Sequence, residues 1–280
     1  MSRGPVHNED MPERRPQVVA HRGASATRAE HTLGAYVAAL DQGADALECD
    51  VRLTADGHLV CVHDRSVRRT ANQPKSNGVI STMELADLED LDFASWKSPW
   101  AELDDEAPDT DPELNKVLTL RRLLETVSSY PRKVELAIET KHPTRYAGLV
   151  ERRLVRLLEE FGWTGRDSPV RVMSFSWVAL RRVRRLAPEL PLVMLVDNRA
   201  AWYRTRPFVD NDWESGPGIE VVREHPELIR KLVASGTRVN CWVVNEPADV
   251  DRCVDLGVAG IITDRPGAVV TYLSQSGRGV

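Results

Sequence analysis

The chain has 280 residues, 42% of them hydrophobic, and its 37 basic and 42 acidic side chains give a net charge of −5. A chain of this length and apolar content can bury one large core, so a single main domain is expected. The interspersed charges argue against nucleic acid or an anionic membrane surface as a partner, and no run approaches the roughly 18 apolar residues of a membrane span. Small molecules are the expected partners, and nothing in the sequence indicates an oligomeric state.

The amino-terminal residues and the cysteines bear on order and compartment. Residues 1–16 carry three prolines and mixed charges with almost no large apolar side chains, so we predict a disordered tail. The four cysteines show no C-x-x-C spacing, and most lie in apolar strand-like runs where free buried thiols are ordinary; they are Cys49, Cys61, Cys241 and Cys253. Together with the absence of an apolar leader segment, this predicts a cytoplasmic protein with reduced thiols.

The first predicted unit is a strand, a polar loop and a helix. Residues 17–20 form a short apolar strand that leads directly into His21, Arg22 and Gly23. Thr32 then opens an apolar helical pattern, which a glycine stops.

Two further strands are predicted over residues 45–53 and 58–63. Only the turn signal at 54–57 lies between them, which is too short for a crossover helix and is typical of a hairpin. We favour instead two strands of the same sense with the second helix missing, because Asp50 and His63 would then lie at one strand end.

Residues 65–120 interrupt this alternation and are predicted to be an insertion that could cap the site. Trp96 and Trp100 are expected to form its own small core. The segment 102–113 holds seven acids and no base, but it lacks the glycine of a calcium-binding loop. It is therefore expected to be a mobile, solvated loop.

From residue 116 strands and helices alternate again. Strands are predicted over 134–141, 170–175, 192–196, 239–244 and 260–263, and helices over 118–127, 146–161, 177–186, 226–235 and 247–256. Residues 199–218 are expected to be irregular, and 219–222 is an extended piece without assignment. Eight parallel-type strands favour a (β/α)₈ TIM barrel over residues 17–270, lacking a regular second helix and carrying a small insertion after the third strand, with a C-terminal tail at 271–280.

In such a barrel, polar residues at the carboxyl ends of the strands converge. Glu48 and Asp50 alternate along one strand and so share a face; the other converging residues are His21, Arg22, His63, Glu139, Lys141 and Trp242. Burying this many ionisable groups costs several kcal/mol each unless they are paired or hold an ion. Three carboxylates and no thiolate favour a hard divalent cation, Mg²⁺ or Ca²⁺, over Zn²⁺. The alternatives are solvated acids on an exposed strand and a plain surface pair of Lys141 with Glu139.

The order of these motifs resembles the glycerophosphodiester phosphodiesterase family over about residues 17–267. The matching motifs are His21-Arg22-Gly23, Glu30-His31-Thr32, Glu48-x-Asp50, His63-Asp64, Glu139-x-Lys141, Trp242-x-Val244-Asn245 and Thr263-Asp264-x-Pro266. The resemblance implies a metal-dependent TIM barrel with a small insertion after the third strand. One position departs from it, because the family usually has Asn where this chain has His31, and the roles of His31 and Glu30 stay open.

The resemblance also implies roles for the residues. Glu48, Asp50 and Glu139 would be the metal ligands, His21 and His63 the acid/base pair, and Arg22 and Lys141 the phosphate contacts. The reaction would be metal-dependent hydrolysis of glycerophosphodiesters, the deacylated head groups of phospholipids, to sn-glycerol 3-phosphate and an alcohol. One histidine would take a proton from the nucleophile, either water or the neighbouring glycerol hydroxyl, and the other would protonate the leaving group. Trp242 offers an apolar wall for the carbon face of glycerol, or else packs in the core.

Two other functions are compatible with the same fold. A lysophospholipase of D or C type would need an apolar rim for acyl chains, for which the insertion offers Leu91, Phe93, Trp96 and Trp100. A catalytically silent barrel that binds phosphorylated ligands should have lost a histidine or a carboxylate. All five such residues are present here, which argues against the silent barrel.

Overall fold

The computed structural model describes residues 15–72, 77–97 and 111–276. The expected disordered tail at 1–16 therefore lies almost wholly outside the described residues, as do Trp100 and most of the acidic segment 102–113. Among the described residues, every helix is too short or too polar to span a bilayer.

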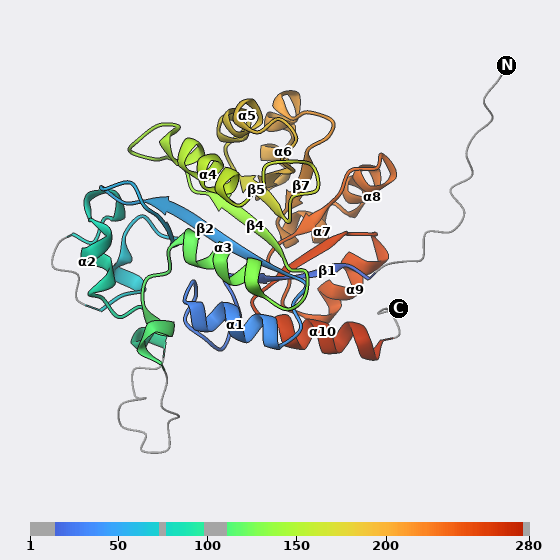
Figure 1. Cartoon of the computed structure of the whole chain (residues 1–280). Helices are drawn as coiled ribbons and strands as arrows, with labels where there is room; N and C mark the ends of the chain where they lie inside the picture. Colours follow the sequence, from blue (N-terminus) through green and yellow to red (C-terminus); the bar gives the residue numbers. More distant parts are fainter. Residues whose placement is uncertain (1–14, 73–76, 98–110, 277–280) are drawn as a thin grey trace.

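Eight parallel strands form a nearly closed barrel with helices around it (Figure 1). Around the sheet the order is β7-β6-β5-β4-β2-β1-β9-β8, and parallel bridges from Ser215 to Val239 and from Gly218 to Trp242 bring β7 beside β8. The barrel strands are β1 (Gln17–His21), β2 (Ala46–Leu53), β4 (Glu135–Thr140), β5 (Val170–Ser174), β6 (Leu192–Val196), β7 (Glu214–Pro217), β8 (Asn240–Cys241) and β9 (Gly260–Thr263). The predicted TIM barrel is confirmed.

Helices follow each barrel strand, directly or after an excursion. They are α1 (Leu33–Asp41), α3 (Leu120–Ser129), α4 (Leu149–Glu160), α5 (Trp177–Leu186), α6 (Arg199–Thr205), α7 (Ile219–Glu224), α8 (Pro226–Ala234), α9 (Pro247–Asp255) and α10 (Pro266–Gln275). The predicted start of α1 is confirmed, because the Thr32 hydroxyl accepts a hydrogen bond from the backbone N–H of Ala35 and caps the helix. Helix α10 runs into residues 271–275, where a tail was expected.

The strand after β2 differs from the interpretation that we favoured. β3 (Leu59–Cys61) pairs antiparallel with β2, placing Cys61 opposite Val51, so it forms a hairpin and is not a barrel strand. Because β3 runs back along the end of β2, the chain still returns to Asp50. The backbone C=O of Asp50 accepts a hydrogen bond from the N–H of Val62 at 3.0 Å. The predicted direction was wrong, but His63 nevertheless arrives beside Asp50.

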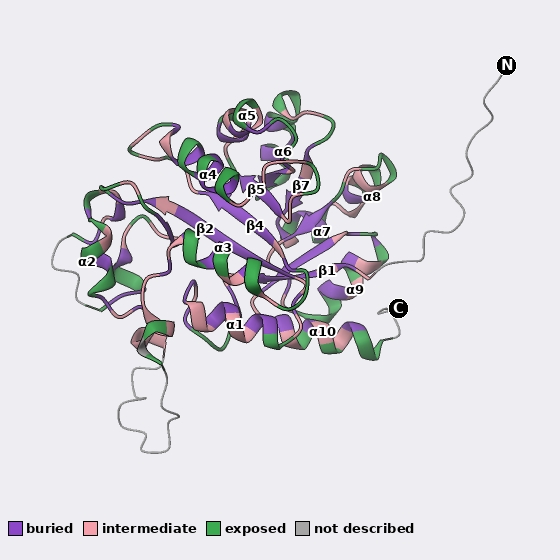
Figure 2. Ribbon diagram, in the orientation of Figure 1, coloured by how far each residue is buried: buried purple, intermediate pink, exposed green. Residues whose placement is uncertain are grey.

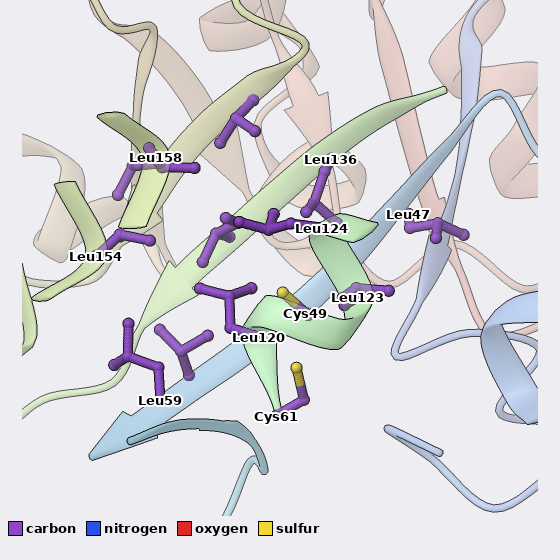
Figure 3. Packing of buried hydrophobic residues seen from close by; sticks show 14 of the residues in the cluster. Leu47, Cys49, Leu59, Cys61, Leu120, Leu123, Leu124, Leu136, Leu154 and Leu158 are labelled. Carbon is purple, nitrogen blue, oxygen red and sulfur yellow. The ribbon is translucent and has the colours of Figure 1, made fainter. Parts of the chain in front are cut away.

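As predicted, no helix lies between β2 and β3, and residues 118–127 fall largely in a helix, α3. Because β3 is not a barrel strand, α3 takes the place of the second barrel helix, after the β2–β3 hairpin and the insertion. Its leucines pack over the outward faces of β2 and β4 (Figure 3); they are Leu120, Leu123 and Leu124 against Leu47, Cys49 and Leu136. Since alternate residues of β2 face the helices, Glu48 and Asp50 face the barrel interior.

One barrel strand, β7, comes from residues predicted to be irregular. α6 and β7 both lie within 199–218, and α7 begins at Ile219, where an extended piece was expected. β7 has the sequence Glu-Ser-Gly-Pro, which lacks the β-branched and aromatic residues that signal a strand. A Cβ at Gly216 would lie 2.5 Å from the end of the Leu195 side chain, so a larger residue there would require that leucine to shift.

The insertion between β3 and α3 has a small core of its own. It contains helix α2 (Leu85–Glu89) and the 3₁₀ turns η1 (Val67–Arg69), η2 (Ile80–Thr82), η3 (Ser95–Lys97) and η5 (Pro112–Asn115). The buried side chains are aliphatic with one phenylalanine, and include Val67, Ile80, Met83, Leu88 and Phe93. Trp96 is outside this core and half-buried, so its predicted place in the core was wrong. The barrel strands, by contrast, are buried along almost their whole length (Figure 2).

At the amino end of the barrel strands, Arg171 of β5 is buried among polar partners. Its guanidinium donates to the Gln17 amide oxygen at 2.9 Å and pairs with Glu135 and, at 4.0 Å, with Glu214. We expect Arg171→Ala to lower the free energy of unfolding by about 2–3 kcal/mol, because it leaves two carboxylates without this cation. Urea unfolding followed by circular dichroism measures this, with the exposed Arg230→Ala as control. Equal losses in both variants would contradict the prediction.

Candidate active site

The predicted site residues meet at the carboxyl ends of the barrel strands. A pocket of about 140 Å³ is lined by seven of them, together with Met173, Phe175, Leu195, Val243 and Ile262; the seven are His21, Arg22, Glu48, His63, Glu139, Lys141 and Trp242. Asp50, the eighth, is buried and contacts Lys141 and Arg22. The sequence motifs are thus brought together from strands that are far apart in the chain.

Three buried carboxylates form one cluster. Asp50 and Glu139 are register partners on adjacent strands, Glu48 lies two residues before Asp50, and one oxygen from each residue lies within 4.8 Å of the others. Burial and the charge of Asp50 raise the pKa of Glu139 to about 8 and hold that of Glu48 well above its usual range. The three cannot all be ionised cheaply unless additional positive charge is present.

Two cations already contact the cluster. Lys141 Nζ lies 3.1 Å from Asp50 and 2.9 Å from Glu139, and Arg22 Nε lies 3.0 Å from Asp50. Burial works against the charge of Asp50, but the His31 hydrogen bond and the neighbouring positive charges outweigh it and hold its pKa well below the usual range. Lys141 is mostly buried, so it is not a solvated surface partner of Glu139. Oxygen donors without a thiolate fit a hard divalent cation.

His21 is oriented by a carboxylate from the other end of the chain. Its Nδ1 lies 2.7 Å from Asp264, which also accepts hydrogen bonds from Ser25 at 2.9 Å and Asn245 at 2.7 Å. These bonds outweigh the effect of burial and lower the pKa of Asp264. Because an ionised Asp264 requires a proton on Nδ1, the other ring nitrogen of His21 is left for chemistry.

His63 is held by a chain of ion pairs that passes through the insertion. Its Nδ1 lies 2.7 Å from Asp64, and Arg69 of η1 contacts Asp64 at 2.6 Å and Glu30 at 2.7 Å. Glu30 in turn pairs with Arg22 at 3.2 Å. Burial and the charges of Arg22 and Lys141 lower the pKa of His63, while Asp50 partly opposes them, so the ring favours its neutral form.

Comparison with known proteins places this geometry in a family. Residues 21–268 match the model of the glycerophosphoryl diester phosphodiesterase family. The chain belongs to this family. It is 44% identical to a Mycobacterium tuberculosis protein named "Probable glycerophosphodiester phosphodiesterase 1", with 93% of each chain covered. It is 31% identical to the glycerophosphodiester phosphodiesterase of Bacillus subtilis, covering 89% of this chain and 83% of that one. The protein is therefore an enzyme of the glycerophosphodiester phosphodiesterase type.

Solved structures agree with the fold. An Oleispira antarctica phosphodiesterase in complex with the product sn-glycerol-3-phosphate superimposes with a TM-score of 0.76 at 25% identity, covering 92% of this chain and 97% of that one. A protein from Silicibacter pomeroyi superimposes with a TM-score of 0.79 at 24% identity over 94% and 95% of the two chains, and shows the fold alone.

His31, the one position that departs from the family pattern, is hydrogen-bonded to Asp50, a candidate metal ligand. The ring is buried, with Nε2 2.9 Å from Asp50 and Nδ1 2.8 Å from the Tyr36 hydroxyl. Burial lowers the pKa of His31, which favours a neutral ring that donates from Nε2 to Asp50. The Tyr36 hydroxyl beside Nδ1 also donates to the Glu48 backbone carbonyl at 3.1 Å. His31 therefore fixes the orientation of the Asp50 carboxylate.

The loop after β1 is shaped by unusual backbone conformations. Arg22 and His31 have φ of 57° and 62°, a left-handed conformation that is uncommon outside glycine and gathers at functional sites. Gly23 also has a positive φ, and a Cβ there would lie 2.6 Å from the Ala35 backbone. The glycine of the His-Arg-Gly motif therefore lets the loop pass close to α1 and aim its two polar neighbours at the pocket.

Sequence analysis missed the residues that orient the histidines. Three of them occur in the motifs but were given no role, because the surrounding sequence does not indicate which side chain each one contacts. They are Asp64, Asn245 and Asp264. Arg69 had no signal at all, because its partners are brought to it only by the folding of the insertion against the barrel.

Glu30 provides a test of the ion-pair chain. Burial would raise its pKa, but Arg69 and Arg22 outweigh that effect and lower it from 4.5 to about 2, so its stabilising contribution is present above pH 4.5 and is lost as pH falls toward 2. We expect Glu30→Gln to cost about 2 kcal/mol at pH 7, a value reduced for partial exposure, and progressively less in acid. Urea unfolding across this pH range measures it, with Glu125→Gln on the exposed face of α3 as control. A cost independent of pH would contradict the assignment.

Proposed function

We propose that this protein hydrolyses glycerophosphodiesters to sn-glycerol 3-phosphate and an alcohol, in a reaction that depends on a divalent cation. The observation that carries the proposal is the cluster of Glu48, Asp50 and Glu139 in a pocket that also presents two oriented histidines. The product named in the Oleispira antarctica complex supports the same substrate class.

Glu48, Asp50 and Glu139 would hold the cation, and Mg²⁺ or Ca²⁺ suits an all-oxygen donor set. When bound, the cation supplies positive charge against the non-bridging oxygens of the phosphoryl group. Arg22 and Lys141 line the same pocket and would donate hydrogen bonds to these oxygens, whose negative charge grows during substitution.

His21 and His63 would move the protons. One ring nitrogen accepts a proton from the attacking hydroxyl, whose oxygen forms a new bond to phosphorus. The other histidine gives its proton to the alcohol oxygen as the bond from that oxygen to phosphorus breaks. With water as the overall reactant, glycerol 3-phosphate and the free alcohol balance the reaction. Asp264 and Asp64 each fix the tautomer and the orientation of one ring.

Trp242 would bind the carbon face of glycerol. Its indole N–H donates to the Gly216 carbonyl at 2.8 Å, which fixes the ring, and Phe175 meets it edge-on at 5.4 Å between ring centroids. Leu91 and Phe93, two of the four residues named as candidates for the acyl-chain rim that a lysophospholipase would need, are buried in the insertion. All four cysteines are free and buried, which supports our proposal of a cytoplasmic location.

The test is release of glycerol 3-phosphate from a panel of glycerophosphodiesters with choline, ethanolamine, glycerol and inositol head groups. Each is assayed in Mg²⁺, in Ca²⁺ and in EDTA. We expect release that requires a cation and identifies the preferred head group. Absence of turnover from every substrate, with glycerol 3-phosphate still bound, would favour the silent barrel instead.

A further inference from the structure

A small recess opens beside the catalytic pocket, on the side of the insertion. It is formed by the end of β2, the loop between β4 and α4, and two segments of the insertion, and Lys141 lines both the recess and the catalytic pocket. We call it the arginine recess. All of its charged lining residues in the described part of the chain are basic; they are Arg52, Arg65, Lys141 and Arg145.

Arg52 reaches the recess because of its position on β2. Residues 48, 50 and 52 alternate along this strand, so Arg52 projects to the same face as Glu48 and Asp50. Its Nε donates to the backbone carbonyl of His63 at 2.9 Å, which holds the side chain beside the catalytic pocket. Within the described residues its two terminal nitrogens have no hydrogen-bond or ion-pair partner, so they are available to a ligand.

The positive charge of the recess is not balanced by the protein. Arg65 and Arg145 are exposed, and neither forms an ion pair with a residue that the structure describes. Burial lowers the pKa of Arg52 and the charge of Arg65 adds to this effect, although three nearby carboxylates oppose it. The Arg52 guanidinium is nevertheless charged at neutral pH, so an anion placed beside it would stabilise it.

A buried hydroxyl group in the lining also lacks a partner. The side-chain oxygen of Thr144 is buried and makes no hydrogen bond to any described residue. Buried polar groups of this kind are rare, and one beside unpaired cations points to a ligand that carries oxygen atoms. The recess measures about 30 Å³, and one water molecule needs about 10–15 Å³ of such space. A carboxylate or the outer oxygens of a phosphate therefore match it in size and in charge.

The order of the strands decides which part of the substrate meets the arginine recess. β4 lies four strands from β8 in both directions around the barrel, once the bridges between β7 and the β8 segment are counted. Lys141 follows β4 and Trp242 follows β8, so the two lie on opposite sides of the catalytic pocket. With glycerol on Trp242, the head-group alcohol on the other side of the phosphoryl group extends toward Lys141 and the recess.

We propose that the arginine recess binds a second anionic group on the head-group alcohol, a carboxylate or a phosphate, so that the enzyme prefers glycerophosphodiesters that carry one. The inference rests on the proposed function and leaves its bond cleavage unchanged. Arg52, Arg65 and Arg145 determine specificity and take no part in the proton transfers. Guanidinium groups suit this role because their N–H donors match the paired oxygens of carboxylates and phosphates.

The experiment uses pairs of substrates that differ by one anionic group, assayed in the cation that supports turnover. Glycerophosphoserine has one carboxylate more than glycerophosphoethanolamine, and glycerophosphoinositol 4-phosphate has one phosphate more than glycerophosphoinositol. The variants are Arg65→Gln, Arg145→Gln and the two combined, with Arg65→Lys as the conservative variant. Arg68→Gln is the matched control, because Arg68 is an exposed arginine of the same insertion outside the recess lining.

We expect the wild type to have a lower KM for the anionic member of at least one pair, and the pair with the larger preference identifies the anion. Each single glutamine variant should raise KM for that substrate by about threefold and the double variant by about tenfold, as partly exposed ion pairs do. The kcat values and the KM of the other member should change little. Arg68→Gln and Arg65→Lys should behave as wild type, and added salt should weaken the preference, because it screens exposed charges.

The outcomes separate the arginine recess from the proposed function. Equal KM values within both pairs, or a preference that survives in the double variant, overturn the assignment of the recess and leave the proposed function standing. An equal rise in KM for both members of a pair also overturns it, because the arginines would then act on the phosphodiester itself. Inactivity of the wild type on every one of these substrates and on the head-group panel contradicts the proposed function.

Discussion

Glu48→Gln is expected to abolish turnover and also to remove the rise in melting temperature that a divalent cation gives the wild type. A ligand that binds only the folded state stabilises it by about 2.7 kcal/mol at a hundredfold excess over Kd. Burial and Asp50 raise the pKa of Glu48, so in the cation-free protein this group costs stability as pH rises above its usual value. The glutamine variant should therefore melt at a higher temperature than the cation-free wild type at neutral pH.

Thermal melts in EDTA, Mg²⁺ and Ca²⁺ make this measurement without relying on activity. Glu135→Gln is the matched control, because Glu135 lies at the opposite end of the strand that carries Glu139. The control should keep the cation-dependent shift. A shift that persists in Glu48→Gln would mean that the cation binds elsewhere.

His21→Ala and His63→Ala should each lower kcat by roughly 10²- to 10⁴-fold with little change in stability, since each removes one proton transfer. A substrate with a good leaving group then separates their roles. A p-nitrophenyl ester of glycerol 3-phosphate needs no protonation of its departing oxygen, so the variant that lacks the general acid should recover most of its activity. The variant that lacks the base should stay slow.

The matched controls for the histidines are Asp264→Asn and Asp64→Asn, which leave each ring in place but disturb its tautomer. We expect them to lie between wild type and the corresponding alanine variant. Full activity in either histidine variant on both substrates would show that the residue is not part of the proton path.

The sequence brought the candidate site residues to one end of the barrel, as the structure places them, but it did not reveal every strand around them. Glu48 and Asp50 could be placed because alternation along a strand is a local rule that holds whatever the neighbours are. β7 could not be found, since Glu-Ser-Gly-Pro has no strand-favouring residues and becomes a strand through its pairing with β6 on one side and its bridges to the β8 segment on the other.

The hairpin illustrates a different limit. The turn signal at residues 54–57 correctly indicated a hairpin. We favoured a parallel strand instead, because it was the simpler way to bring His63 to Asp50. β2 continues for three residues beyond Asp50, and β3 pairs antiparallel with this extension. The antiparallel strand therefore also brings His63 back to Asp50. The ion pairs of Arg69 could not be predicted, because ion pairs between distant segments leave no periodic pattern in the sequence.

The barrel is closed by its first and last strands, since β1 pairs with β9, and the contact between His21 and Asp264 spans 243 positions of the chain. During translation, His21 is synthesised early, whereas Asp264, the carboxylate that orients its ring, is synthesised near the end of the chain. A prematurely terminated product ending before β9 would lack Ile262 of the pocket lining, the partner strand of β1, and the carboxylate that orients His21. We therefore expect catalytic competence to depend on completion of synthesis.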